Sequence, residues 1–352
     1  MMPKVAIVYL SYNGKHYLEE VLFALRALDY PKDRLELIFV DNDSHDGSQE
    51  YLRELKDITF FPQTKNLGFA GGNNIGIEHA LLNGADYIFL HNNDLKLDPS
   101  AILHAVTLAQ SDARIGSVQS LMLLWKQPDI INSTGGMVHF LGFGFVRENG
   151  RKSQDVMKLH KEGEEITYAS GAAVLFRASV LKEIGLLDEF LFLYHEDLEL
   201  GWRVRLAGYI NVLSVQSKAY HDYEFKRSVK KFYWMERNRW LVHFSHLKWQ
   251  TLLLIFPWLL LIEIPLCVFA MKGGWVKQWF FAVANLFQPR TWSYLARKRK
   301  ESVHIRRVTD QQIVSLFTDK IDHQETQSLI VTQIANPFFS TVWKYLRPLI
   351  KW

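Results

Sequence analysis

The stretch from Tyr87 to Asp94 places a carboxylate directly behind a short apolar run. The run predicts a buried strand, so that Asn92-Asn93-Asp94 falls at the carboxyl edge of a sheet. Ligands bind at that edge in open α/β sheets. An acid beside two side-chain amides suits a divalent cation that is held mostly by phosphate oxygens. Asp and Asn are also frequent helix N-caps, so this segment alone leaves both interpretations open.

The elements around this stretch alternate between strand and helix. Apolar runs predict strands at residues 5–10, 35–40, 59–61, 87–90 and 116–119, and periodic segments predict helices at about 16–28, 48–55, 74–82 and 100–110. This alternation predicts a parallel, doubly wound sheet. Polar loops follow the first, second and fourth strands, and three such loops at one edge indicate a nucleotide site.

The pattern changes after residue 124. Residues 125–165 are irregular and rich in Gly, Asn and aromatic residues, and we interpret them as an insertion that covers the substrate. A strand is predicted at 169–177 and another at 212–215, with a helix from Glu196 to about Ala207 between them. Glu199 and Arg203 lie one helical turn apart and are predicted to pair.

Seven short motifs occur in a fixed order along this first part of the chain. They are Ser11–Gly14, Val40–Ser48, Asn66–Asn74, Asn92–Asp94, Ser170–Ala172, Glu196-Asp197 and His221. The set resembles the family 2 glycosyltransferases of the GT-A fold, in particular their rhamnosyltransferase-like branch. The resemblance covers residues 3–230. It implies a Rossmann-like, mostly parallel central sheet flanked by helices, and an inverting reaction without a covalent enzyme intermediate.

The resemblance also implies a division of roles among the polar residues. Asp94 matches the last acid of the family's Asp-x-Asp motif, whose first position is Asn92 here. His221 is similar to the family's second metal ligand, although a lone His after a strand is otherwise a structural residue. The implied cofactor is Mn²⁺ or Mg²⁺, acting as a Lewis acid on phosphate oxygens. A neutral imidazole suits Mn²⁺ better.

A carboxylate near the acceptor hydroxyl is needed to remove its proton. Asp197 matches the second acid of the family's Glu-Asp pair and is the predicted general base. Two acids at a helix start also interact favourably with the helix dipole, which would explain Glu196 alone.

The donor nucleotide has its own predicted contacts. Asp41 and Asp43 resemble the acids that bind the base and the ribose, although turn chemistry is an alternative explanation. The Asn66–Asn74 segment is not a dinucleotide fingerprint, and we expect its backbone N–H groups to approach the nucleotide. The remaining predicted substrate contacts are Tyr9, Ser11, Asn13, Lys65, Asn66, Gly68, Asn73, Asn92, Asn93, Gly171 and Glu196.

Composition bounds the rest of the chain. The 352 residues carry a net charge of only +4, and the single Cys267 excludes an internal disulfide and fits a reducing compartment. We expect a catalytic domain at 1–230, a membrane-associated helical region with basic flanks at 231–310, and an amphipathic helical tail at 311–352. The N-terminus lacks a signal-peptide layout, so the first domain is expected to fold in the cytoplasm.

The segment Thr251–Met271 is nearly continuous apolar sequence and is close to the ~20 residues that span a bilayer. Basic residues on both sides, with Arg237 and Arg239 before it, oppose a single span. We therefore favour monotopic or re-entrant attachment to the cytoplasmic face of the membrane. A full span and a buried pair of helices in a homodimer remain alternatives. The basic flanks could bind nucleic acid, but no recognition motif supports that.

These observations lead to one main hypothesis. The chain is expected to transfer a sugar, with dTDP-rhamnose as the suggested donor, to a lipid-linked glycan acceptor at the cytoplasmic membrane face. A UDP-hexose or a UDP-N-acetylhexosamine is the competing donor. A non-catalytic, membrane-bound nucleotide-sugar-binding protein is the alternative that Asn92 supports. A Rossmann dehydrogenase is disfavoured because Tyr9–Gly14 lacks the glycine spacing.

Overall fold

The first strand shows how the central sheet is built. In the computed structural model, which describes residues 2–223, 229–322, 329 and 331–352, every residue of β1 (Val5–Ser11) is buried. Its side chains alternate between two hydrophobic clusters, with Val8 on the side of helix α3 (Gly68–Leu82) and Ile7 on the side of helix α1 (Lys15–Arg26). Helices cover both faces of the sheet, which explains why the strand is a continuous apolar run.

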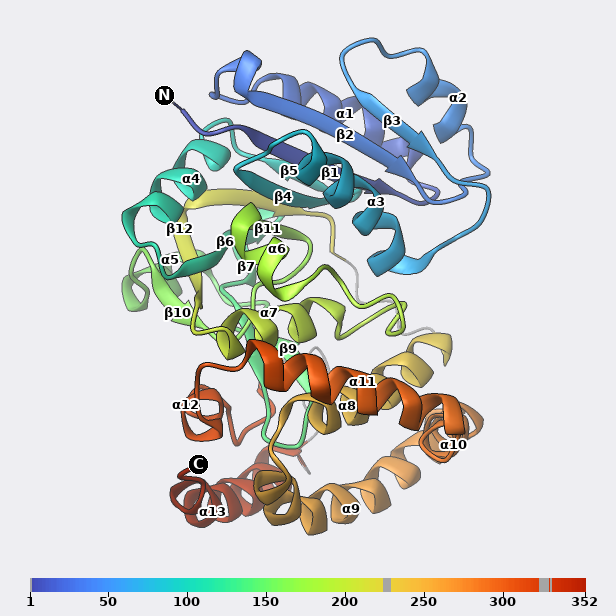
Figure 1. Cartoon of the computed structure of the whole chain (residues 1–352), viewed down its shortest axis with the longest axis vertical. Coiled ribbons are helices and arrows are strands. Elements are labelled where there is room, and N and C mark those ends of the chain that lie inside the picture. The colour runs from blue at the N-terminus through green and yellow to red at the C-terminus, as the bar shows by residue number, and fades with distance from the viewer. Residues whose placement is uncertain (1, 224–228, 323–328, 330) are drawn as a thin grey trace.

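The sheet has ten strands, and eight of them lie in the order β10-β12-β6-β11-β4-β1-β2-β3 (Figure 1). The other two, β5 and β7, pair with β12 and β6. The further strands are β2 (Leu35–Asp41), β3 (Thr59–Pro62), β4 (Tyr87–Asn92), β5 (Leu95–Leu97), β6 (Ile115–Leu124), β7 (Gln127–Ser133), β10 (Glu164–Ile166), β11 (Ala173–Arg177) and β12 (Ile210–His221). A separate hairpin joins β8 (Gly136–Val138) and β9 (Gly144–Val146).

The expected, mostly parallel central sheet is confirmed, and the antiparallel strand β11 interrupts it. Strand β1 is parallel to β2 and β4, but β11 is antiparallel to both β4 and β6. The register explains this reversal: Ala173, the first residue of β11, lies opposite His91 near the carboxyl end of β4. The chain therefore re-enters the sheet from its carboxyl edge, and the Ser170–Ala172 turn lies beside the end of β4.

The insertion at 125–165 is more regular than expected, since it contains β7, β8, β9 and helix α5 (Ser153–Val156). The other helices of the catalytic half are α2 (Ser48–Arg53), α4 (Ala101–Ser111), α6 (Ala178–Ile184) and α7 (Glu196–Leu206).

Helix α3 packs unusually close to the sheet. A side chain at Gly72 or Gly76 would approach Leu10 or Val8 to 2.5 Å. Gly72 and Gly76 thus serve helix–sheet packing, whereas the approach of the segment's backbone N–H groups to the nucleotide stays a prediction. Gly68 differs from them, because its φ of +75° lies in the left-handed region at the start of the helix.

The C-terminal helices form the lower part of the molecule in Figure 1. They are α8 (Val229–His246), α9 (Trp249–Lys272), α10 (Val276–Asn285), α11 (Pro289–Ile305), α12 (Asp310–Val314) and α13 (Asn336–Leu346). The tail packs on the insertion, since the rings of Phe140 and Trp343 stack with centroids 4.7 Å apart. The predicted domain boundaries stay predictions, and the boundary at 230 adjoins residues 224–228, which lie outside the described residues.

Part of the predicted basic flank is interior. Arg237, Arg239 and Lys298 are buried, which contradicts their use as surface charges that decide membrane topology. Lys298 Nζ lies 3.0 Å from Glu199, whose carboxylate also contacts Arg203 Nη2 at 2.6 Å. The predicted pairing of Glu199 with Arg203 is confirmed, in the core rather than on the surface.

Candidate active site

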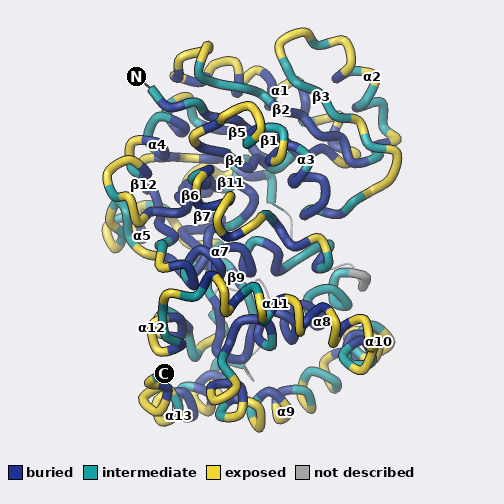
Figure 2. The backbone as a smooth tube through the Cα atoms, viewed as in Figure 1, coloured by how far each residue is buried: buried dark blue, intermediate teal, exposed yellow. Residues whose placement is uncertain are grey.

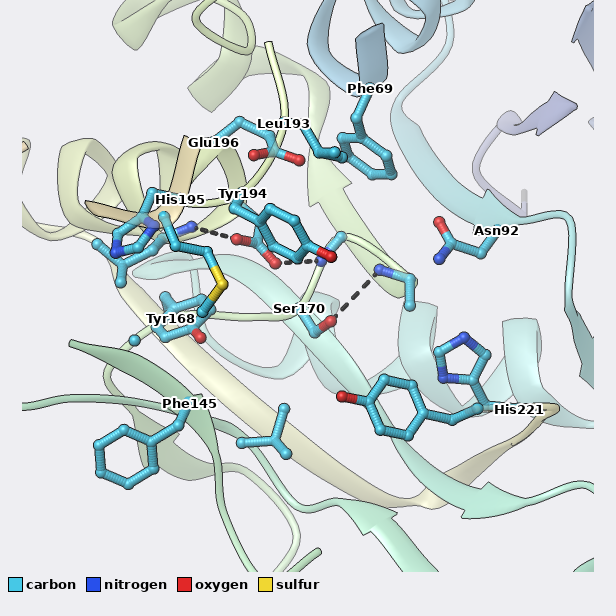
Figure 3. Close-up of a pocket in the computed structure, with 18 of the residues that line it drawn as sticks. Phe69, Asn92, Phe145, Tyr168, Ser170, Leu193, Tyr194, His195, Glu196 and His221 are labelled. Atoms are coloured by element: carbon cyan, nitrogen blue, oxygen red, sulfur yellow. Dashed lines mark hydrogen bonds between the residues drawn. The ribbon is translucent and has the colours of Figure 1, made fainter. Parts of the chain in front are cut away.

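A cavity of about 350 Å³ lies at the carboxyl edge of the sheet, beside the first turn of α7 (Figure 3). Segments far apart in the sequence meet there: the end of β4, the Ser170–Ala172 turn, β9, the start of α7 and the end of β12. The polar and aromatic residues that line it include Asn92, Tyr168, Ser170, Gly171, Tyr194, His195, Glu196, Asp197, His221 and Tyr223. Of the predicted site residues, Asn92, Gly171, Glu196, Asp197 and His221 are thus brought together.

Asp94 and His221, the two predicted metal ligands, lie in contact with each other. His221 Nε2 lies 3.1 Å from Asp94 Oδ1, and His221 Nδ1 lies 2.9 Å from Asn132 Oδ1. Because an amide oxygen can only accept, Nδ1 carries the proton in this arrangement. A neutral His221 then presents the lone pair of Nε2 to a carboxylate oxygen. Two acceptors this close require a proton or a cation between them.

This arrangement fits a divalent cation with few protein ligands. Among the described residues, no three His, Cys, Asp or Glu side chains form a group that could hold a metal. Asp94 and His221 would therefore supply two ligands, and phosphate oxygens and water would supply the others. Asn132 acts from behind, since its hydrogen bond orients the imidazole.

Backbone donors orient the carboxylate of Asp197. Its Oδ2 accepts from Gly171 N–H at 3.0 Å, and its Oδ1 accepts from Leu198 N–H at 2.7 Å. Burial raises the pKa of Asp197, and these hydrogen bonds oppose the rise. A base with a raised pKa holds a proton more strongly and is closer to the working pH, which favours general-base catalysis.

Glu196 is buried beside Asp197, and its Oε2 has no hydrogen-bond partner among the described residues. Burial, and then the charge of Asp197, raise the pKa of Glu196. No cation contacts either carboxyl group among the ion pairs of the described residues. The two acids therefore titrate as a coupled pair.

The loop before α7 is strained and is held from outside. Phe192, Tyr194 and His195 have φ values of 63°, 65° and 69°, a conformation that costs non-glycine residues of order 1–3 kcal/mol each. The Nδ2 amide of Asn238, on α8, lies 2.9 Å from Leu191 O, 3.1 Å from Leu193 O and 2.7 Å from Tyr194 O. Helix α8 thereby fixes the segment that leads into Asp197.

The predicted nucleotide contacts Asn13 and Asp41 lie at two neighbouring loops that are joined by hydrogen bonds. Asn13 N–H donates to Ser44 Oγ at 2.8 Å, and Asn13 Oδ1 accepts from His45 N–H at 2.9 Å. Asp41 is buried and its Oδ1 accepts from Ser44 N–H at 2.9 Å, so the turn chemistry considered as an alternative is present. Its Oδ2 has no partner among the described residues, and neither does Ser11 Oγ on the neighbouring strand. Nucleotide binding by these residues stays a prediction.

The other predicted contacts fall into two groups. Asn93 packs its side chain against Gly14, Asp43 has a φ of 71°, and Lys65 and Asn66 are exposed at the same end of the sheet. Tyr9 and Asn73 are fully buried and bond to the backbone carbonyls of Asn93 and Phe69. Strand β1 and helix α3 thus place both side chains in the interior, and a direct ligand contact for them stays a prediction.

Several residues of the site were missed. Asn132, Tyr168, Tyr194 and Asn238 all line the cavity or hold a residue that does. Asn132 and Tyr168 belong to or adjoin the irregular insertion, and Asn238 lies on a helix assigned to the membrane region. Asn132 and Asn238 stand among other polar residues, in Asn132-Ser133-Thr134 and Glu236-Arg237-Asn238-Arg239, so the sequence gives no clear signal for them.

Helix α8 also brings a cation to the cavity. Lys231 Nζ lies 5.7 Å from the centroid of the Tyr194 ring. Burial lowers the pKa of Lys231, and the negative charge of Asp94 acts in the opposite direction. A lysine therefore also lies within electrostatic reach of Asp94, one of the two predicted metal ligands.

Proteins that are similar to this sequence are named as enzymes that transfer sugars. It is 24% identical over 209 residues to the low-salt glycan biosynthesis hexosyltransferase Agl10 of Haloferax volcanii, covering 58% of this chain and 62% of that protein. It is 25% identical over 240 residues to the N-acetylglucosaminyl-diphospho-decaprenol L-rhamnosyltransferase of Mycobacterium tuberculosis, covering 63% of this chain and 76% of that protein. The chain thus spans about three fifths of the first relative's length.

Solved structures share the fold. GalNAc-T7 with UDP, GalNAc and Mn²⁺ superposes with a TM-score of 0.58 at 15% identity, over 70% of this chain and 49% of that one. The mannosyltransferase PcManGT of Pyrobaculum calidifontis, with GDP-Man and Mn²⁺, gives 0.52 at 16% identity, over 86% and 87%. The model of the family described as "Glycosyl transferase family 2" matches residues 6–185, just over half of the chain, and this range includes Asp94. The GT-A fold and this match establish that the chain belongs to glycosyltransferase family 2.

Proposed function

We propose that this protein transfers a sugar, with inversion, from a nucleotide-diphosphate donor to a hydroxyl group of a lipid-linked glycan. The observation that carries the proposal is that His221, which contacts Asp94 at 3.1 Å, and the backbone-oriented carboxylate of Asp197 line one cavity. Figure 3 draws His221 on one side of this cavity and His195 and Glu196, which directly precede Asp197, on the other. A donor and an acceptor between them would have the leaving group and the base on opposite sides.

The reaction then needs a single displacement. Asp197 accepts the proton of the acceptor hydroxyl while the oxygen of that hydroxyl forms a bond to the anomeric carbon. The bond from that carbon to the diphosphate oxygen breaks, and the diphosphate leaves with the electron pair. Asp94 and His221 would hold Mn²⁺ or Mg²⁺, which supplies neutralisation of the leaving group's charge when bound. Lys231 adds a positive charge at the same end.

Donor and acceptor are the finer part of the proposal. The resemblance to the rhamnosyltransferase-like branch and the mycobacterial relative support dTDP-rhamnose as donor and a polyprenyl-diphosphate-linked glycan as acceptor. The competing donor is a UDP-hexose or a UDP-N-acetylhexosamine. Such an acceptor lies at the cytoplasmic face of the membrane, where we place the protein. The apolar helix α9 is compatible with attachment there.

A panel of dTDP- and UDP-sugars, assayed for metal-dependent nucleotide release with a synthetic lipid-linked acceptor, tests the proposal. Asp197→Asn should abolish transfer while donor binding, measured by calorimetry, stays unchanged. Glu50→Gln is the matched control, because Glu50 is an exposed acid in the first turn of another helix, α2. Turnover at the wild-type rate in Asp197→Asn would remove the base assignment. Donor binding without turnover in the wild type would instead favour a non-catalytic binding protein.

A further inference from the structure

Helix α9 has an apolar face that nothing in the described part of the protein covers. Its buried residues, among them Leu252, Ile255, Leu259 and Ile262, form one stripe along the helix. A second stripe points outward and runs the whole length of the helix; it consists of Leu253, Phe256, Leu260, Leu261, Ile264, Val268 and Met271. By length and composition α9 is the one helix of the described residues that could cross a membrane, and only 22% of its most apolar window is buried.

The neighbouring helices extend this face. Figure 1 shows α9 along the base of the molecule, with α13 beside its start and α10 beside its end, and Figure 2 shows exposed positions along all three helices. The rings of Trp258 on α9 and Phe338 on α13 lie 5.9 Å apart. We call this surface the basal face and define it by the exposed residues of α9 together with Phe280, Phe281, Phe338, Tyr345 and Leu349.

The one acid within α9 is turned away from the basal face. Glu263 forms an ion pair with Arg239 of α8, which is 1% exposed. Its oxygens also accept from Trp240 Nε1 at 3.1 Å and Trp279 Nε1 at 2.8 Å. A carboxylate in this position would be costly if it faced lipid, and the fold neutralises Glu263 on the protein side of the helix.

The charges on the three helices of the basal face are almost all basic. Glu263 is the only acid in residues 249–300, and residues 331–352 contain none. Exposed basic residues lie at the ends of the three helices: Lys272, Lys277, Lys344, Arg347 and Lys351. An apolar centre with a basic rim is complementary to an anionic bilayer surface. A second copy of the chain is a poor occupant, because a two-fold interface would place one basic rim against the other.

We propose that the basal face docks onto an anionic lipid bilayer with α9 lying in the plane of the membrane. The geometry of α9 decides between lying and crossing. A crossing helix is surrounded by lipid on all sides, whereas one stripe of α9, from Leu252 to Ile262, is packed on the protein and its acid is paired with α8. The inference deepens the proposed function and rests on it only for the choice of the cytoplasmic leaflet.

Vesicle co-sedimentation of the full chain tests the docking. Wild type should bind phosphatidylglycerol vesicles at least tenfold more tightly than phosphatidylcholine vesicles, and Leu260→Glu with Ile264→Glu should reduce the binding at least tenfold. Phe23→Glu with Leu82→Glu is the matched control, because both residues are exposed hydrophobics on α1 and α3 of the catalytic half. The control should bind vesicles as wild type does.

Outcomes of this assay separate from those of the transfer assay. Nucleotide release with a water-soluble acceptor analogue should be the same in wild type and in both double variants, whether or not the sugar specificity is as proposed. Wild type that ignores both kinds of vesicle would overturn the docking. So would a light-scattering mass showing that the Leu260→Glu, Ile264→Glu variant converts a dimer into a monomer while vesicle binding is unaffected.

A depth measurement distinguishes a lying helix from a crossing one. Cys267 is the only cysteine, so single spin labels can be placed in a Cys267→Ser background at Leu253, Leu260 and Val268. A helix in the plane gives the three labels similar depths in oxygen and nickel collision experiments. A crossing helix rises ~1.5 Å per residue, which would separate the labels at 253 and 268 by about 22 Å in depth. That depth gradient would refute the in-plane arrangement.

Discussion

The first turn of α7 carries two regions with opposite behaviour: the Glu196–Asp197 pair that faces the cavity, and Glu199 that faces the C-terminal helices. Loss of contact with water raises the pKa of Glu196 and Asp197. Burial would raise the pKa of Glu199 too, but the charges of Arg203 and Lys298 outweigh it and hold this pKa well below its usual range. The presence of cations therefore decides which acid serves structure and which acids remain available for proton transfer.

Asp197 and Glu199 also differ in what holds them. Glu199 is anchored by ion pairs to Arg203, Lys298 and His246, at 2.6, 3.0 and 3.1 Å. Among the described residues, Asp197 is held by the backbone N–H groups of Gly171 and Leu198 alone, and the loop before it is held by Asn238. A carboxylate that must exchange a proton cannot also be neutralised by a permanent cation, which explains why the site uses backbone and amide donors.

The largest effect is expected from Glu199→Gln. The change leaves Arg203 and Lys298 buried without their counter-charge, and breaking such a buried pair typically costs about 3–5 kcal/mol. Urea unfolding at pH 7 should show this loss, whereas Asp197→Asn should leave the free energy of unfolding unchanged or raise it. Because the folded-state pKa of Glu199 is lowered, its contribution is present at neutral pH and is lost as the pH falls through that pKa. Equal stability of Glu199→Gln and wild type would show that Glu199 does not have the structural role that distinguishes it from Asp197.

Asn238→Ala should have the next largest effect, which should appear in the transfer rate through the position of Asp197. The strained backbone at 192–195 loses the side chain that bonds to Leu191, Leu193 and Tyr194, so Asp197 is no longer well placed. A displacement of about 1 Å can reduce a rate about 100-fold, and we expect kcat to fall about 10- to 100-fold with an unchanged donor KM. Asn336→Ala is the control, since Asn336 is a buried amide that bonds to Ile321 O. An unaltered kcat in Asn238→Ala would show that α8 does not position the base.

A smaller effect is expected from Gly171→Ala. The added Cβ would lie 2.8 Å from Phe69 Cζ and 3.5 Å from Asp197 Cβ, so the Phe69 ring must shift. Overpacking of this kind costs about 1 kcal/mol or somewhat more. Transfer should slow several-fold, because the Gly171 N–H group that donates a hydrogen bond to Asp197 moves. Phe69→Leu in the same chain should restore both stability and rate. If the second substitution makes matters worse, the contact with Phe69 is not the reason for glycine at this position.

The pH dependence is the most sensitive comparison. The base must be ionised, so kcat/KM should fall as the pH decreases through the raised pKa of the Glu196–Asp197 pair, above the range of an ordinary aspartate. Glu196→Gln removes a neighbouring negative charge and should shift this limb to lower pH. A limb that stays in place would assign it to a group outside α7.

The main strands β1, β2, β3, β4, β6, β11 and β12 and the helices α1, α3, α4 and α7 were predictable, because their hydrophobic periodicity is local. The motifs that contain Asp94, Asp197 and His221 were recognisable too, since each follows a strand or opens a helix, and the roles of these residues stay predictions. The direction of β11 was not predictable, because it depends on which edge of the sheet the chain re-enters. The true positions of Arg237, Arg239 and Lys298 were missed for a similar reason, since a count of charges along the chain does not show which are buried.

Sequence alone determined the family, the placement of polar motifs at the carboxyl edge of the sheet and the presence of an apolar helix near the C-terminus. Tertiary structure decided the rest: that Asn132 orients His221, that α8 holds the loop before Asp197, and that Glu263 turns inward to Arg239. The physical reason is that motifs and periodicity are properties of neighbouring residues. The environment of a charged group is set by contacts between residues that lie tens to hundreds of positions apart, and only the folded chain brings those together.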